Sequence, residues 1–113
     1  IYRTVYICEG AINAETLGEN GIATGGKAVS RWQVNKFIKS QVEKFIILID
    51  PDAKDKALDL AFKLVPFKKV KVVFLPDNED VNSLGKQRTL EYVRETTYQT
   101  YQELLTIKSQ LKL

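Results

Sequence analysis

Phe45-Ile46-Ile47-Leu48-Ile49-Asp50-Pro51-Asp52 joins an unbroken apolar run to two carboxylates. A short continuous apolar run rich in β-branched residues is typical of a strand buried on both faces, as in a parallel sheet covered by helices. The carboxyl ends of such strands are where open α/β folds bind their ligands. Asp50 and Asp52 would repel each other at that edge unless a cation lay between them, and carboxylate oxygens suit Mg²⁺. A second interpretation stays open, in which Asp50 or Asp52 caps the helix that follows.

The composition is that of one ordinary domain of 113 residues, with enough apolar side chains for a core. The chain has no histidine, which excludes a Ser-His-Asp triad or a histidine-ligated zinc built from its own residues. Its formal net charge of +3 permits a polyanionic partner without requiring one. The sequence contains no signal peptide or membrane-length apolar run, so we expect a cytoplasmic protein without membrane contact. Because it contains no methionine, even at position 1, we expect the chain to be part of a longer protein.

Strand and helix patterns alternate along most of the chain. We expect strands at residues 3–8, 22–24, 45–49 and 70–75, and helices at residues 11–17, from the N-cap Ser30 through Lys39, and at 53–64, before a short segment that ends at Gly85. This alternation predicts right-handed βαβ units. It therefore predicts an α/β fold with a mainly parallel four-stranded sheet flanked by helices.

The last part of the chain, residues 88–111, shows one continuous helical pattern with apolar side chains at roughly heptad spacing. A helix of that length would exceed about 30 Å, which is longer than the small sheet. We therefore divide the chain into a core at residues 1–87 and a C-terminal helix at residues 88–113. That helix packs on the core or leads into a neighbouring domain.

Further acids follow the other strands. Glu9, beside Gly10, follows the first strand, and Asp80 follows the fourth. In a parallel sheet these positions share one edge, so Glu9, Asp50 and Asp52 would lie within about 10 Å if the first and third strands are neighbours. The three acids form a candidate magnesium site, with Asp80 as a candidate fourth ligand.

Residues 21–28 have the glycine and lysine spacing of a phosphate-binding P-loop. Ala28 replaces the serine or threonine that would hold Mg²⁺, and no buried strand comes directly before the segment, so we reject a nucleoside-triphosphatase site. The glycines instead shape a strand-to-helix turn, where Lys27 lies near a helix N-terminus and could bind a phosphate. Lys54 adjoins the acidic edge and could meet a phosphate there. Most other lysines of this basic stretch are expected on a solvated surface, and they are Lys56, Lys63, Lys68, Lys69 and Lys71.

Together these segments resemble a Toprim domain, the catalytic fold of bacterial-type primases, of type IA and II topoisomerases and of some nucleases. Residues 5–14 resemble the hydrophobic strand followed by Glu-Gly in that family, and residues 47–52 resemble its Asp-x-Asp motif. Residues 23–30 with Gln33, and residues 75–85, are similar to the DnaG-type primase branch, the latter to primases of phages and plasmids. The sequence departs from the family at Asn13, Asp55, Val81 and Asn82, but it keeps the acids Glu9, Asp50 and Asp52.

The resemblance implies a DNA primase, a nucleotidyltransferase that uses Mg²⁺ or Mn²⁺ to make short RNA primers on single-stranded DNA during replication. The implied partners are single-stranded DNA, ribonucleoside triphosphates, and a flanking zinc-binding or helicase domain. The implied site residues are Glu9, Asp50 and Asp52 as catalytic and metal-binding acids, Asp80 as a further metal ligand, and Gly10, Gly26, Lys27 and Lys54 for nucleotide or DNA binding. Glu9 either completes the metal site or acts as a general base.

Two alternatives stay open. The first is phosphoryl transfer of the Toprim nuclease or topoisomerase type, which would use the same acids. The second is a non-catalytic Toprim module that binds nucleic acid. Clustered acids argue against the second, because negative charge gains nothing in a site that only binds DNA.

Overall fold

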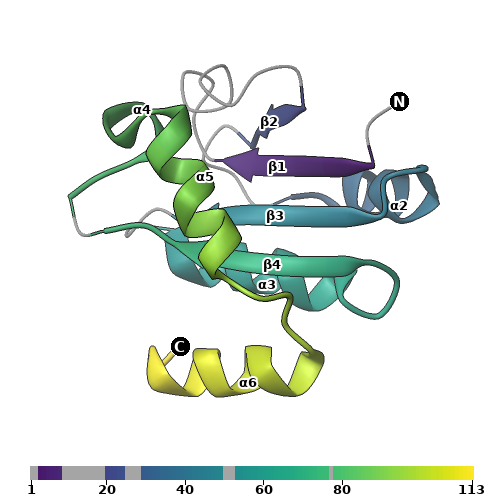
Figure 1. Ribbon diagram of the computed structural model, residues 1–113. Coiled ribbons are helices and arrows are strands. Elements are labelled where there is room, and N and C mark those ends of the chain that lie inside the picture. Colours follow the sequence, from purple (N-terminus) through teal and green to yellow (C-terminus); the bar gives the residue numbers. More distant parts are fainter. Residues whose placement is uncertain (1–2, 9–19, 25–28, 50–52, 77) are drawn as a thin grey trace.

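The computed structural model describes residues 3–8, 20–24, 29–49, 53–76 and 78–113, and Figure 1 shows their arrangement. The strands are β1 (Thr4–Cys8), β2 (Gly21–Ala23), β3 (Lys44–Ile49) and β4 (Lys69–Phe74). They form one sheet in the order β2-β1-β3-β4, and all three pairings are parallel. The predicted α/β fold with a four-stranded, mainly parallel sheet is therefore confirmed.

The described helices are α2 (Arg31–Lys39), α3 (Lys54–Leu64), α4 (Val81–Leu84), α5 (Lys86–Glu95) and α6 (Tyr101–Gln110). The expected helix at residues 11–17 lies outside the described residues. Ser30 caps α2 as predicted, because its Oγ accepts a 3.2 Å hydrogen bond from the Gln33 N–H while Gln33 Oε1 accepts one from the Ser30 N–H. No helix in the described ranges is long and apolar enough to cross a membrane.

The two faces of the sheet bury two separate apolar clusters (Figure 1). On one face α2 and α3 cover the strands, and α6 packs on α3. The strand residues buried there are Val5, Ile7, Phe45, Ile47, Ile49, Val70 and Val72. On the other face α4 and α5 cover part of the sheet, and the strand residues buried there are Cys8, Ile46, Leu48 and Val73. Both faces of β3 are thus buried, as its unbroken apolar run predicts.

The single helix expected at residues 88–111 is wrong, because α5 ends at Glu95 and α6 begins at Tyr101. Thr100 starts α6 with a capping box, in which its Oγ1 accepts from the Glu103 N–H and Glu103 Oε1 accepts from the Thr100 N–H. The regular spacing of apolar residues continues across the break, because α5 and α6 each bury one apolar face of their own. The second helix packs on α3, and in Figure 1 it lies below the edge strand β4.

Gln99, between these helices, pairs with the outer edge of β4. Its N–H donates to the Val70 carbonyl at 3.0 Å in an antiparallel bridge. Its side-chain Oε1 accepts from the Val72 N–H at 2.7 Å, and its Nε2 donates to the Val72 carbonyl at 3.2 Å. One residue thus satisfies the backbone of an edge strand that would otherwise offer unpaired groups.

We expect Gln99→Ala to lower the free energy of unfolding by about 1–2 kcal/mol, because the Val72 N–H and carbonyl lose their side-chain partners. Urea denaturation followed by circular dichroism measures this loss. The matched control is Gln102→Ala, since Gln102 is exposed in the first turn of α6, and a change within about 0.5 kcal/mol is expected there. Equal losses in the two variants would contradict the proposed role of Gln99.

Candidate functional site

The carboxyl edge of the sheet brings the ends of β1 and β3 together. These strands are parallel neighbours, with Ile7 paired to Ile47, so the prediction that the first and third strands are adjacent is confirmed. Neighbouring strands lie about 5 Å apart, and β1 ends at Cys8 while β3 ends at Ile49. The next residues in sequence are Glu9 and Asp50.

Most of the predicted site residues lie outside the described residues, and for them the site stays a prediction. They are Glu9, Gly10, Gly26, Lys27, Asp50 and Asp52. Within the described ranges, no group of three or more acidic, histidine or cysteine side chains is arranged to hold a metal ion. A magnesium site at this edge would therefore have to include acids outside the described residues, and Glu9, Asp50 and Asp52 stay the predicted ones. As a donor set, three carboxylates suit a hard cation.

Asp80 acts as the N-cap of α4. Its Oδ1 accepts a 2.8 Å hydrogen bond from the Ser83 N–H, and Ser83 Oγ accepts one from the Asp80 N–H at 2.9 Å. This capping box uses one carboxylate oxygen. Metal coordination through Asp80 stays a prediction.

Lys54 is the first residue of α3 and is half-buried. The N-cap position of α3 is Ala53, whose side chain makes no capping hydrogen bond. Asp50 and Asp52, the alternative N-cap residues, lie outside the described residues, so a capping contact from either stays a prediction. A lysine in the first turn of a helix opposes the helix dipole, whereas an anion at that end is favoured. Phosphate binding by Lys54 stays a prediction.

Lys71 departs from the expectation for the basic stretch. It lies within β4, is only 7% exposed, and donates a 2.9 Å hydrogen bond from Nζ to the Val93 carbonyl at the end of α5. Its Nζ also lies 4.4 Å from the centre of the Tyr98 ring. Burial, and secondarily the charge of Lys44, lower the pKa of Lys71, and burial raises the pKa of Tyr98. The sequence feature that could have indicated the burial of Lys71 is its position between Val70 and Val72 in a predicted strand.

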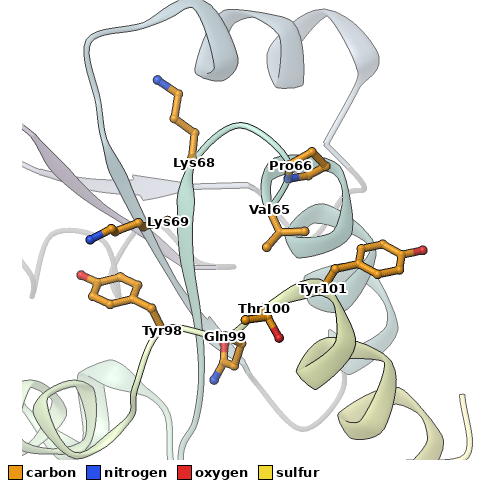
Figure 2. Close-up of a pocket in the computed structure, with 8 residues that line it drawn as sticks. All are labelled: Val65, Pro66, Lys68, Lys69, Tyr98, Gln99, Thr100 and Tyr101. Atoms are coloured by element: carbon orange, nitrogen blue, oxygen red, sulfur yellow. The ribbon is translucent and has the colours of Figure 1, made fainter.

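At the opposite, amino edge of the sheet lies a pocket of about 540 Å³, shown in Figure 2. It lies between the end of α3, the start of β4 and the segment that joins α5 to α6. Its lining residues are Val65, Pro66, Lys68, Lys69, Tyr98, Gln99, Thr100 and Tyr101. Sequence reasoning assigned these tyrosines to one long helix and did not anticipate this pocket.

Comparison with solved structures finds similar folds among primases. The E. coli primase catalytic core superimposes with a TM-score of 0.75 at 16% sequence identity, over 98% of this chain and 39% of that one. A DnaG primase catalytic domain bound to single-stranded DNA gives a TM-score of 0.70 at 17% identity, over 85% of this chain and 34% of that one. A further DnaG catalytic core gives a TM-score of 0.67 at 19% identity, over 85% of this chain and 35% of that one.

The TM-scores establish likeness of fold, at sequence identities below 20%. The chain spans between a third and two fifths of the structures that it matches. Its sequence matches no model of a known protein family, and no curated protein matches it either.

Proposed function

We propose that this chain is the Toprim catalytic domain of a DNA primase, which joins ribonucleotides into short primers on single-stranded DNA. The observation that carries the proposal is the parallel adjacency of β1 and β3, because each is followed in sequence by acids of the Toprim motifs. The likeness of fold to primase catalytic cores supports it. A cytoplasmic location, where template and ribonucleotides meet, follows from this proposal.

In the reaction, the 3′ hydroxyl of the growing strand attacks the α-phosphorus of a ribonucleoside triphosphate, and the bond to the leaving pyrophosphate breaks. When bound, Mg²⁺ offsets the charge that develops on the phosphate oxygens. Asp50 and Asp52 would hold the metal. Glu9 would complete the site or take the proton of the attacking hydroxyl. Lys27 and Lys54 would each bind a phosphate.

The test incubates the full-length protein with single-stranded DNA, labelled ribonucleotides and Mg²⁺, and resolves the products on a denaturing gel. We expect short RNA products. Lys54→Ala should raise the KM for ribonucleotides about tenfold, since a charge-assisted contact to phosphate is lost. The matched control is Lys63→Ala at the other end of α3, where the lysine pairs with Asp59 on the helix surface, and its KM should not change.

Cleavage of the DNA without incorporation of ribonucleotides would overturn the primase proposal in favour of a Toprim nuclease. Binding of DNA without either reaction would instead favour a non-catalytic module.

A further inference from the structure

The amino-terminal half of one sheet face carries cations where an apolar layer would be expected. Strand pairing places Thr4, Lys44 and Lys69 side by side in one row. The next row on the same face contains Tyr6, Ile46 and Lys71. Because side chains alternate along a strand, both rows lie on the face that α5 covers farther along. In Figure 1, α5 crosses in front of the carboxyl part of the strands, and no described helix lies in front of their amino-terminal part.

Tyr98 adds an aromatic ring to these rows. It is half-buried in the segment between α5 and α6, and its ring centre lies 4.4 Å from Lys71 Nζ and 5.8 Å from Lys44 Nζ. Lys69 is exposed and lines the pocket of Figure 2 together with Tyr98. We call the set Tyr6, Lys44, Lys69, Lys71 and Tyr98 the lysine–tyrosine face.

The charges of this face are not balanced within the described part of the chain. The ion pairs found there join Arg3 to Glu43 and Lys63 to Asp59, and neither includes a lysine of the lysine–tyrosine face. Lys44 and Lys69 are direct neighbours on adjacent strands. Like charges directly opposite each other in a sheet are destabilising. A bound polyanion would remove that cost.

The ring of Tyr98 distinguishes between two classes of polyanion, which are single-stranded nucleic acids and acidic peptides. Proteins that bind single-stranded nucleic acid combine a cationic surface that follows the phosphates with aromatic side chains on which bases stack. An acidic peptide would satisfy the lysines but offers no planar ring to Tyr98. β3 and β4 are each about 20 Å long, so this face lies well away from the edge at which the proposed chemistry would occur.

We propose that the lysine–tyrosine face binds single-stranded DNA, with phosphates at Lys44 and Lys69 and a base against the Tyr98 ring. This surface would hold the strand at a distance from the carboxyl edge. The inference rests on the proposed function only in taking that strand to be the template. Binding is therefore measured without Mg²⁺ or ribonucleotides, so that either proposal can fail alone.

The experiment measures the fluorescence anisotropy of a labelled oligothymidylate of about 12 nucleotides as the chain is added at several salt concentrations. For Lys44→Gln/Lys69→Gln we expect weaker binding, and a slope of log K against log salt that is smaller by about 1.4, or about 0.7 for each lysine. Tyr98→Leu should weaken binding about tenfold with the slope unchanged, because it removes a stacking surface and no charge.

The matched control, Lys63→Gln/Lys108→Gln, removes two lysines from α3 and α6 and should leave affinity and slope unchanged. Circular dichroism checks the fold of each variant. If the double variant unfolds, Lys69→Gln alone must still lower the slope by about 0.7, because Lys69 is exposed. An oligonucleotide that does not bind, or a control that weakens binding equally, overturns the proposal. The proposal is also overturned if polyglutamate competes fully with the oligonucleotide and Tyr98→Leu binds the oligonucleotide with normal affinity. The lysine–tyrosine face would then suit an acidic protein segment.

Discussion

Asp50→Asn is expected to reduce primer synthesis by the full-length protein more than about a hundredfold, and Asp52→Asn should do the same. The loss of residues that merely orient metal ligands costs 10–100-fold, so the loss of a proposed ligand should cost at least the upper value. The fold should survive, because removing one of several crowded carboxylates relieves repulsion in the metal-free protein. Ribonucleotide incorporation and urea denaturation measure the two effects.

Metal binding gives an independent measurement of the same substitution. In the unsubstituted chain, Mn²⁺ should broaden the amide signals of Cys8 and Ile49, which end the two strands at the proposed site. Asp50→Asn should greatly reduce that broadening. The matched control is Asp59→Asn, which makes the same chemical change on the exposed surface of α3 and should alter neither activity nor broadening. Broadening that persists in Asp50→Asn, together with a steep loss of stability, would contradict a metal-binding role.

The sheet was predictable because its strands carry their own signals. β3 is a continuous apolar run, and such a run is buried on both faces whichever strands lie beside it. Alternation of strands with helices then requires parallel pairing. The strand order was not predictable from these patterns, because it depends on contacts between segments far apart in the chain. The adjacency of β1 and β3, on which the candidate site depends, was therefore stated as a condition and is supplied by the structure.

The C-terminal region was mispredicted because the interpretation gave weight to periodicity and none to capping. Thr100 and Glu103 have the spacing of a capping box, which was visible in the sequence. The pairing of Gln99 with β4 was not visible, since nothing local to Gln99 indicates an edge strand. The pocket beside Tyr98 depends on this same break and could not be anticipated without it.

The residues that the sequence places before and after the central strands differ in charge. Acids follow the strands, as the motifs indicate. Lys44 begins β3 and Lys69 begins β4, and of the two only Lys69 was interpreted, as part of an ordinary solvated surface. Only the strand register shows that Lys44 and Lys69 are neighbours. A cationic amino edge and an acidic carboxyl edge would separate strand binding from metal chemistry, which agrees with both proposals.

The second large effect is expected for Leu104→Ala, which tests whether α6 belongs to the folded core. Leu104 is fully buried in the cluster beneath α2 and α3, whereas Leu105 on the same helix is 38% exposed. Both changes to alanine carry the same small gain in helix propensity, so their difference reports burial. We expect Leu104→Ala to lower the free energy of unfolding by about 3 kcal/mol and Leu105→Ala by less than about 1 kcal/mol. Urea denaturation of this chain measures both. Equal small losses would mean that α6 contributes little to the core, which would then end with α5 at Glu95. A large loss for Leu104→Ala alone would instead make α6 part of the unit that folds, and the core would extend through Gln110.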